Sequence, residues 1–561
     1  MNRRLTSSGT RLKKTRQSTT RTARWLPCRI DDRAAPELLV TVLGTVDTSL
    51  CQALFNPATD VLLQNTGKVL KDYYRKHLGV TSYQPATTAF ADPPGGWCSW
   101  GYYCREITPA EVLVNARWLA QNLAAYGLTL VLLDDGWQAG GRDWTGVRDS
   151  FRNGMKWLAD EIRKLGLMPG LWLCPHGQEN EAVMRAAGCF MLEANGKPVA
   201  TFFGGVPVDP THPKTPAYLR RLIRGVTREW GYEYLKMDGI PSLVELYRQQ
   251  RHRFHDPGTD AVQAAQRTFA AIRHGAGRSV FLAGCAGLPL ETIGFFDAQR
   301  TGADVDAEWR AFGNAVDATM RGLYLHRIAW YSDPDYCLLR PPLSLEMARA
   351  WATLHGMTGQ LLYLGDRLPD LAPERVKLIK KIAPAAPIRP FDLFPAEQHK
   401  PLFDLKVNHR GRAYDVVAAF NYDDRVPTVV RVDFAKMGLD PARRWHVYDF
   451  WAGDYLGLCD VGVFVEVPAA ACRVLTVCPE GDFPVLLSTD RHITQGWPDI
   501  EAFDVSRPAQ ALSGASRVMA GEPYTLTFGL PMTARGPLPS RRSPSAGSGK
   551  CIRVPGAGWR R

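Results

Sequence analysis

The 561-residue sequence contains no run of about 18 consecutive apolar residues, the length that a membrane-spanning helix needs. None of its twelve cysteines forms a CxxC pair or lies at zinc-finger spacing to a histidine. No glycine-rich phosphate-binding turn follows the first predicted strand of the central region. These absences argue against a membrane protein, a zinc domain and a dinucleotide enzyme. We therefore expect no metal and no cofactor.

The excess of basic residues lies almost entirely at the two ends of the chain. The net charge is +12, but residues 1–25 contain eight Lys or Arg and residues 535–561 contain seven, with no acidic residue in either stretch. The remaining residues are slightly acidic, so we expect no nucleic-acid partner and no membrane partner. Polar, basic ends of this kind are typical of solvated disordered tails, which we favour over a nucleic-acid-binding arm.

The N-terminus and the cysteines predict the compartment. No apolar segment of signal-peptide length follows the basic N-terminus. The cysteines are scattered, several of them within apolar runs, and buried free thiols agree with a reducing compartment. We therefore expect a cytoplasmic protein.

From Gly95 onward, short apolar runs alternate with amphipathic stretches. Near-continuous apolar runs are typical of buried parallel strands, and eight strand–helix units over about 290 residues predict an α/β fold, a (β/α)8 barrel. A doubly wound sheet is the alternative, but it usually has fewer strands. Thr108, Pro109 and Glu111 predict the start of the first long helix. The eight predicted strands lie at 96–100, 128–137, 167–175, 232–239, 279–287, 295–304, 328–335 and 360–366.

After Asp404 the pattern changes to short strands separated by turns, which predicts an antiparallel β-sandwich to about Pro484 and a further small β unit. Before the barrel, Asp60–Leu78 has helical spacing. The predicted organisation is a disordered tail (1–25), an N-terminal segment (26–92), the barrel (93–395), the β-sandwich region (400–533) and a second disordered tail (534–561).

Acidic residues gather where the predicted strands end. Asp134, Asp135, Asp238, Asp304 and Asp333 lie at or just beyond the C-terminal ends of their strands. In a barrel these ends meet at one mouth, where active sites are built. One aspartate capping a helix is commonplace, but five at one mouth need another reason, because charges are costly to desolvate.

Asp238 and Asp304 suit the two carboxyl groups of a retaining glycosidase, one as nucleophile and one as general acid/base. Lys236 lies two residues before Asp238 on the same strand face, where its ammonium would keep the carboxylate ionised. Asp304 follows Arg300 by four residues, and a half-apolar site would raise its pKa. The structural alternatives are a Lys236–Asp238 ion pair and a helix N-cap at Asp304.

Asp134 and Asp135 can accept hydrogen bonds from sugar hydroxyls or bind a metal, and we favour the sugar because no histidine or third acid lies nearby in the sequence. Tryptophan faces stack on sugar rings, although a single tryptophan is more often part of the core. We predict that Trp172 lines the site and leave the roles of Trp97, Trp100, Trp137 and Trp330 open.

An ordered set of motifs resembles the α-galactosidases of glycoside hydrolase family 36, in clan D with family 27 and raffinose-synthase-like proteins. The resemblance covers about residues 95–390, with the sandwich behind it. The motifs are GWCSW, VLLDDGW, LMPGLWLCP, VDPTHP, YLKMDG, RTGADVDAEW and SDPDYCLLR.

The resemblance implies roles for individual residues. The motif KxDG makes Asp238 the nucleophile and Lys236 a sugar contact, whereas RxxxD makes Asp304 the acid/base and places Arg300 near the 2-hydroxyl. Cys285 occupies a position where the family often has a cysteine near that hydroxyl. The pair Asp134 and Asp135 would hold the 4- and 6-hydroxyls.

Three further features of the resemblance complete the expectation. Asp209, in VDPTHP, is expected to be structural. Many of these enzymes carry a large N-terminal β-sandwich, whereas only about ninety residues precede the barrel here. The loop CPHGQENEAV also differs from the family pattern.

We therefore expect a retaining α-galactosidase that hydrolyses terminal α-galactosides through a covalent glycosyl-enzyme intermediate. Two alternatives remain open at this point. One is a raffinose-synthase-type galactosyltransferase using the same two aspartates, and the other is a non-catalytic carbohydrate-binding barrel. The expected partner is a small-molecule oligosaccharide or glycoside, and self-association is compatible with the sequence.

Overall fold

A computed structural model of the chain describes residues 89–531, except 288, 328, 389, 391–398 and 509–510, together with strand residues 54–56, 61–63, 69–71 and 550–555. The predicted N-terminal tail lies outside the described residues. In the N-terminal segment, strands β1 (Leu54–Asn56), β2 (Val61–Leu63) and β3 (Val69–Lys71) form an antiparallel sheet. The prediction of a helix over Asp60–Leu78 is therefore wrong for β2 and β3, whose backbone groups pair with a neighbouring strand instead.

The barrel sheet confirms all eight predicted strands, and every neighbouring pair in it is parallel. Leu361 N–H donates to the Ser332 carbonyl at 3.1 Å, which joins the last strand to the seventh and closes the circle. The strands are β4 (Gly95–Cys98), β5 (Leu128–Leu133), β6 (Met168–Leu173), β9 (Tyr234–Met237), β10 (Phe281–Gly284), β11 (Ala298–Arg300), β12 (Tyr331–Asp333) with its continuation β13 (Tyr336–Cys337), and β14 (Tyr363–Leu364).

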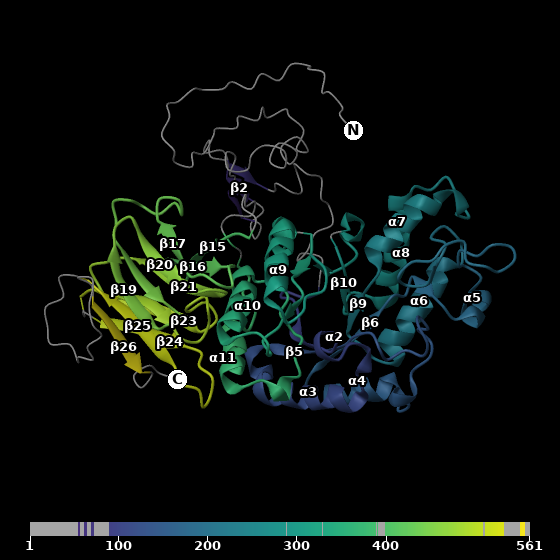
Figure 1. Cartoon of the computed structure of the whole chain (residues 1–561), viewed down its shortest axis with the longest axis horizontal. Helices are drawn as coiled ribbons and strands as arrows, with labels where there is room; N and C mark the ends of the chain where they lie inside the picture. The colour runs from purple at the N-terminus through teal and green to yellow at the C-terminus, as the bar shows by residue number, and fades with distance from the viewer. Residues whose placement is uncertain are drawn as a thin grey trace, which may run out of the picture. The chain divides into compact units, whose positions relative to one another are not determined.

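Helices follow the strands and pack outside them (Figure 1). The Thr108 side chain accepts the Glu111 N–H with Pro109 at the first position, which confirms the predicted start of α3. The helices are α2 (Trp100–Tyr103), α3 (Pro109–Asn122), α4 (Met155–Lys164), α5 (Glu181–Ala187), α6 (Thr215–Arg224), α7 (Ile240–Gln250), α8 (Ala261–Ala276), α9 (Trp309–Gly322), α10 (Leu345–Thr358) and α11 (Pro373–Ile382). A short antiparallel pair, β7 (Gly177–Gln178) and β8 (Val206–Pro207), with α5 between its strands in the sequence, lies between β6 and α6.

Aromatic residues fill the N-terminal end of the barrel. Tyr234, Phe281, Tyr331 and Tyr363 are the first residues of their strands. Phe281 stacks on Tyr234 with ring centroids 4.9 Å apart and on Tyr331 at 6.3 Å, and the hydroxyls of Tyr234 and Tyr363 hydrogen-bond to each other. This packing fills one end of the barrel with rings, so the polar strand ends gather at the other end.

The C-terminal region is antiparallel, as predicted. A five-stranded sheet runs in the order β15-β16-β21-β18-β19, and the pair β17-β20 packs with it over a core that includes Val432, Trp445, Val447 and Leu475. The strands are β15 (Leu402–His409), β16 (Arg412–Asn421), β17 (Thr428–Asp433), β18 (Trp445–Asp449), β19 (Asp454–Cys459), β20 (Gly462–Val467), β21 (Ala471–Pro479), β22 (Val485–Thr489), β23 (Ile500–Ser506), β24 (Ala511–Ser516), β25 (Thr525–Leu530) and β26 (Lys550–Pro555).

Strand β26 lies within the stretch predicted as the second disordered tail. It pairs antiparallel with β25 from Thr525↔Pro555 to Leu530↔Lys550. These six residues have an ordered backbone because an existing strand edge supplies their hydrogen-bond partners. Residues 534–549 and 556–561 of the predicted tail lie outside the described residues.

Helix α10 joins the barrel to the sandwich (Figure 1). The buried Thr353 hydroxyl oxygen accepts the Trp451 indole N–H at 2.9 Å and the Cys472 thiol at 3.2 Å. On α9, the Trp309 indole donates to the Tyr422 carbonyl at 2.9 Å. The two regions therefore share hydrogen bonds, and the one between Cys472 and Thr353 is fully buried.

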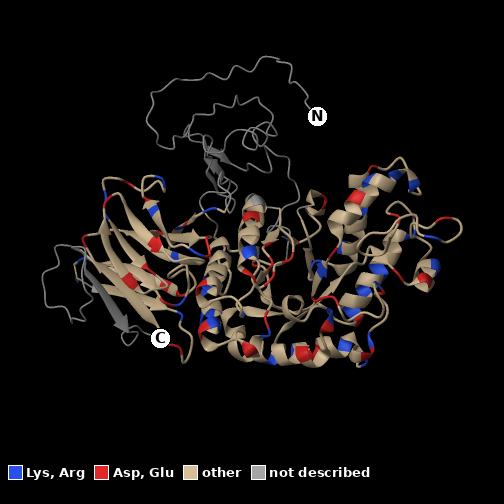
Figure 2. Cartoon of the chain, viewed as in Figure 1, with Lys and Arg blue, Asp and Glu red and all other residues tan. Residues whose placement is uncertain are grey.

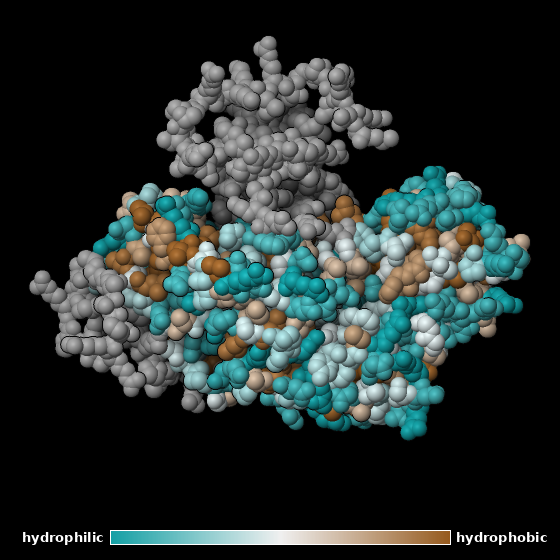
Figure 3. All heavy atoms as spheres, in the orientation of Figure 1, coloured by the Kyte–Doolittle hydropathy of each residue, from teal (hydrophilic) through white to brown (hydrophobic). Residues whose placement is uncertain are grey.

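In the view of Figure 2, acidic and basic residues are interspersed over the outer helices of the described region. Apolar side chains gather over β17 and β20, where Val429 and Phe464 are exposed (Figure 3). Within the described part of the chain, no helix has both the length and the apolar character needed to span a bilayer.

Candidate active site

Lys236, on β9, forms its ion pair with Asp134 and not with Asp238. Its ammonium lies 2.7 Å from Asp134 Oδ2, and both side chains are almost fully buried. Desolvation is the largest single effect and lowers the pKa of Lys236, but Asp134, Tyr336 and Cys285 together outweigh it and raise that pKa well above its ordinary value. Burial in turn raises the pKa of Asp134, although Lys236 opposes the rise. The structural alternative of a Lys236–Asp238 ion pair is therefore not found among the described residues, because the Lys236 side chain reaches across the barrel mouth toward β5.

Asp238 follows β9 and is held by two N–H donors. The Trp172 indole donates to Oδ2 at 3.1 Å, and the backbone N–H of Gly239 donates to Oδ1 at 2.6 Å. Gly239 has φ +75°, a left-handed conformation that glycine adopts without steric cost, and it caps the start of α7. The turn and the indole thus fix the direction of the carboxylate at the end of its strand.

Arg300 lies among three carboxylates. Its guanidinium is 2.9 Å from Asp304 Oδ1, 3.3 Å from Asp333 Oδ2 and 2.8 Å from Asp335 Oδ1. Asp333 and Asp335 are buried, whereas the Asp304 side chain is 59% exposed. Burial raises the pKa of Asp335 to about 7 despite Arg300. Arg300 therefore links the exposed Asp304 carboxylate to the buried carboxylates of Asp333 and Asp335.

The structure removes one alternative for Asp304 and corrects one expectation. Helix α9 begins at Trp309 behind Glu308, so the alternative role of Asp304 as its N-cap is wrong. Partial burial tends to raise the pKa of Asp304, but the charges of Arg300 and Lys236 and hydrogen bonds from Arg300 and Trp100 outweigh it. The pKa consequently lies below its ordinary value, because these two cations, both predicted at the site, act on Asp304 more strongly than burial does.

Asp135 differs from Asp134 in its partners, although both lie just beyond β5. Its Oδ2 accepts from Arg105 Nε and Arg142 Nη1, both at 3.0 Å, and its Oδ1 accepts from Gln138 at 2.5 Å. Arg105 and Arg142 thus both bind this carboxylate through its Oδ2 atom. Among the described residues, no group of three or more His, Cys, Asp or Glu is arranged to hold a metal ion.

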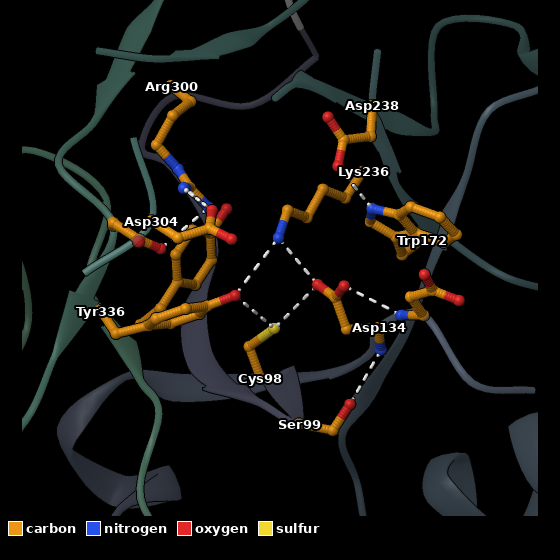
Figure 4. Close-up of polar contacts among 12 residues, drawn as sticks. Cys98, Ser99, Asp134, Trp172, Lys236, Asp238, Arg300, Asp304 and Tyr336 are labelled. Carbon is orange, nitrogen blue, oxygen red and sulfur yellow. Dashed lines mark hydrogen bonds and ion pairs between the residues drawn. The ribbon is translucent and has the colours of Figure 1, made fainter. Parts of the chain in front are cut away.

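Cys285, after β10, shows that the predicted residues share one site. Burial raises the pKa of its thiol well above the ordinary value, Arg300 and Lys236 oppose the rise, and Asp238 and Asp304 add to it, so all four charges lie near the sulfur. Asp238 and Asp304 extend from opposite sides toward the space around the Lys236 ammonium (Figure 4). The mouth therefore brings together the predicted residues Asp134, Asp135, Trp172, Lys236, Asp238, Cys285, Arg300 and Asp304.

The tryptophans divide between core and site. Trp97, Trp137 and Trp330 are fully buried. Trp172 is also buried, in edge contact with Trp144 and Phe203, so it meets the site through its indole N–H rather than an open face. Trp100 is partly exposed beside Asp304.

Asp209 lies in a turn and binds backbone groups. It accepts the backbone N–H groups of Thr211 and His255 at 2.9 and 2.7 Å, which fits the expected structural role.

Four residues of the mouth were not predicted from the sequence, namely Cys98, Arg142, Asp335 and Tyr336. The position of Asp335 and Tyr336, directly after Asp333 at a strand end, was the available signal.

The melibiase family matches residues 112–268, which span the barrel from α3 to α8. The α-galactosidase C-terminal β-sandwich domain matches residues 408–477. The two matches occur in the order barrel, then sandwich. They fall on the two regions that the structure describes.

Relatives and solved structures agree with this arrangement. A "Probable alpha-galactosidase" of Dictyostelium discoideum is 22% identical over 403 residues, covering 69% of this chain and 92% of that protein. An A type blood α-D-galactosamine galactosaminidase of Flavonifractor plautii is 25% identical over 184 residues, covering 30% of this chain and 17% of that protein.

A β-L-arabinopyranosidase of Geobacillus stearothermophilus, named as a family 27 enzyme, superposes with a TM-score of 0.56 at 19% identity, over 70% of this chain and 98% of its own. This structural likeness concerns the fold alone. The two domain matches and the α-galactosidase relative show the class of protein. The chain is a glycoside hydrolase of the α-galactosidase type, a barrel enzyme with a C-terminal β-sandwich.

Proposed function

We propose that the chain is a retaining α-galactosidase with Asp238 as nucleophile and Asp304 as general acid/base. The observation that carries the proposal is the placement of these two carboxyl groups on opposite sides of the Lys236 ammonium at one barrel mouth (Figure 4). In retaining glycosidases one carboxylate attacks the anomeric carbon and the other protonates the departing oxygen.

In the first step, an Asp238 oxygen forms a bond to the anomeric carbon while the glycosidic bond breaks. Asp304 gives its proton to the leaving oxygen, so the aglycone departs as a neutral alcohol. In the second step, Asp304 takes a proton from water, the water oxygen bonds to the anomeric carbon, and Asp238 leaves as a carboxylate. Trp172 and Gly239 hold Asp238 in line for both displacements.

Asp304 must carry a proton to act first as an acid, yet the cations around it lower its pKa in the free protein. The exposure of its side chain supports a resolution, because a bound sugar would cover it. Removing a carboxylate from water favours its protonated form. Substrate binding is therefore expected to raise the pKa of Asp304 at the moment when the proton is needed.

The sugar preference is inferred from Asp134 and from the relatives. Asp134, held against Lys236 at the mouth, can accept sugar hydroxyls. The names of the similar proteins refer to galactosides, galactosaminides and β-L-arabinopyranosides. These sugars share the axial 4-hydroxyl of galactose, which supports a galactose-shaped pocket here.

Hydrolysis of 4-nitrophenyl α-glycosides with galactose, glucose and N-acetylgalactosamine tests this assignment. We expect the galactoside to be preferred and Asp238→Ala to abolish turnover. Azide should restore activity to Asp238→Ala and release a β-galactosyl azide, because the small anion replaces the missing nucleophile. Full activity in that variant without azide would refute the assignment of the nucleophile.

We also propose that the chain belongs to family 36, on the order of its motifs, and that it is cytoplasmic, on the composition of its N-terminus. No observation favours the transferase or the non-catalytic alternative over hydrolysis.

A further inference from the structure

Four side chains from four barrel strands form a closed polar ring behind the site (Figure 4). Lys236 Nζ lies 2.7 Å from Asp134 Oδ2 and 3.3 Å from the Tyr336 hydroxyl oxygen. Cys98 Sγ lies 3.3 Å from the same Asp134 oxygen and 3.6 Å from the same hydroxyl. Lys236, Asp134, Cys98 and Tyr336 thus each contact two other members, and we call them the Lys236 ring.

The proton directions in the Lys236 ring follow from chemistry. The ammonium can only donate, so it donates to both Asp134 and Tyr336. The Cys98 thiol has one proton, and the carboxylate is its stronger acceptor. The Tyr336 hydroxyl then donates to the sulfur, so the carboxylate, the thiol and the hydroxyl are all paired and one ammonium N–H of Lys236 is left over.

All four members are buried, so these bonds lie in a low-dielectric setting where losing a partner is costly. The backbone around Tyr336 is also fixed, because its carbonyl accepts the Trp351 indole N–H at 2.9 Å. The centroid of the Tyr336 aromatic ring lies 5.7 Å from the Arg300 guanidinium and 5.6 Å from the Lys236 ammonium. Tyr336 therefore lies between the cation beside Asp304 and the cation beside Asp134.

Two of the three ammonium N–H bonds of Lys236 go to Asp134 and Tyr336. The third is left for a ligand hydroxyl. Its direction is set by the other two, because the nitrogen is tetrahedral. A long lysine side chain otherwise has many rotamers, and fixing them before the ligand arrives lowers the entropic cost of binding.

We propose that Tyr336 and Cys98 are positioning residues for sugar binding, which fix the Lys236 ammonium and the Asp134 carboxylate in the geometry that receives the sugar hydroxyls. The inference rests on the proposed function, because it assumes that the pocket between Asp134 and Asp238 holds the glycone. Neither residue belongs to the set that performs the displacement. Their effect should therefore fall on binding more than on chemistry.

The test is a double-mutant cycle of Tyr336→Phe, Cys98→Ala and the double variant, with kcat and KM measured on the preferred aryl α-glycoside. Tyr336→Phe keeps the aromatic ring but leaves a buried ammonium N–H without its acceptor. We expect KM to rise roughly tenfold with kcat nearly unchanged, as for loss of a hydrogen bond to a charged group that serves ground state and transition state alike. Cys98→Ala should raise KM roughly threefold, because thiol hydrogen bonds are weaker.

The coupling between the Tyr336 and Cys98 substitutions shows whether the two residues act through one closed ring or through independent contacts. Once Tyr336→Phe has opened the ring, removing Cys98 should add little, so the double variant should resemble Tyr336→Phe rather than show the product of the two effects. Cys98→Ser should restore much of the wild-type KM, since a hydroxyl can both donate and accept. Multiplying effects, or an unchanged KM in Tyr336→Phe, would overturn the proposal.

Tyr247→Phe is the matched control, because Tyr247 is equally buried and its hydroxyl bonds only structural groups on the outer side of the barrel, the Val208 carbonyl at 3.1 Å and the Thr268 hydroxyl at 3.3 Å. It should lower Tm about as much as Tyr336→Phe while leaving KM unchanged. If Tyr336→Phe merely lowers Tm and kcat together, its role is structural and the proposal fails.

The proposed function and this inference can fail separately. If the wild type prefers a glucoside, the galactose assignment falls, and the cycle is measured on the glucoside. If the wild type hydrolyses no member of the panel, the cycle is measured as galactose affinity by calorimetry. A tenfold weaker affinity in Tyr336→Phe would then sustain the inference, and an absence of galactose binding in the wild type would overturn it.

Discussion

The Arg300 guanidinium lies 2.9 Å from Asp304 Oδ1, and this contact joins a fully buried cation to an exposed carboxylate. On its buried side the same guanidinium meets Asp333 and Asp335. The exposed carboxylate is thereby anchored without being enclosed, so a substrate can approach it. An acid/base at the entrance suits a group that must meet first a leaving group and then water.

Asp304→Asn should separate substrates by their leaving groups. The aglycone of a natural oligosaccharide is a poor leaving group and needs the proton from Asp304. For such a substrate, kcat/KM should therefore fall by about 10²–10⁴-fold. A 4-nitrophenolate leaves without protonation, so formation of the intermediate from that substrate should be nearly unaffected. Steady-state kinetics on raffinose and on 4-nitrophenyl α-galactoside measure the two cases. Asp160→Asn, on the surface of α4, should change neither. Equal losses on both substrates would contradict the role of Asp304.

Trp172→Phe should lower kcat by roughly tenfold, because the indole N–H that orients Asp238 is lost and the nucleophile gains freedom to rotate. The loss should appear in kcat more than in KM. Trp451→Phe removes an indole hydrogen bond of similar length at the sandwich and should lower Tm without affecting kcat. If both variants lost activity in parallel with stability, the orienting role of Trp172 would be wrong.

Gly239→Ala should impair activity beyond its effect on stability. Its φ of +75° makes an alanine there cost roughly 1 kcal/mol, and the added Cβ would lie 3.1 Å from Phe202 and 3.3 Å from Phe203. Relieving that contact moves the turn that donates to Asp238. Gly196→Ala has a similar φ of +81° and no neighbour within 4 Å, so it should lower Tm alone. Comparing kcat/KM and Tm for the two variants checks this, and equal activity would refute it.

Asp415→Asn should change how stability depends on pH. Lys406 lies 2.5 Å from Asp415 and 2.9 Å from Asp404, so one cation serves two buried carboxylates. Burial and the Asp404 charge raise the pKa of Asp415 to about 7. The folded chain holds this proton at pH values where the unfolded chain has lost it, so stability falls as pH rises from the ordinary value near 3.8 to about 7.

The amide of Asp415→Asn does not ionise, so that loss disappears. Between pH 5 and pH 8, the Tm of the variant should gain roughly 2–4 °C on the wild type for each kcal/mol of relief. Asp504→Asn, on the exposed face of β23, should follow the wild-type curve. Parallel curves for wild type and Asp415→Asn would show that Asp415 titrates normally.

The barrel could be predicted because its strands are buried on both faces and therefore form apolar runs, each followed by polar residues at the mouth. The site residues could be predicted for the same reason, since Asp134, Asp238 and Asp304 mark those ends. In the C-terminal region the sequence predicts short antiparallel strands only in general, because strands such as β19, β23 and β24 are not fully buried and carry a weaker pattern.

Partner choice within the site could not be predicted. Lys236 is two residues from Asp238 in the sequence, yet it pairs with Asp134, which is 102 residues away. Cys98 and Tyr336 are 238 residues apart and meet only because their strands lie on neighbouring parts of the closed barrel. The pKa of Asp304 depends on the sum of several such contacts, so its direction also needed three-dimensional structure.

The shared hydrogen bonds at Thr353 have a consequence for how the molecule denatures. A single hydroxyl oxygen accepts from two sandwich residues while its helix packs on the barrel, so separating the regions would strand all three polar groups. The barrel and the sandwich should therefore melt in one cooperative calorimetric transition. A truncated chain ending near Ile388 should expose the inner face of α10 and be prone to aggregation and proteolysis, even though every residue of the active site would still be present.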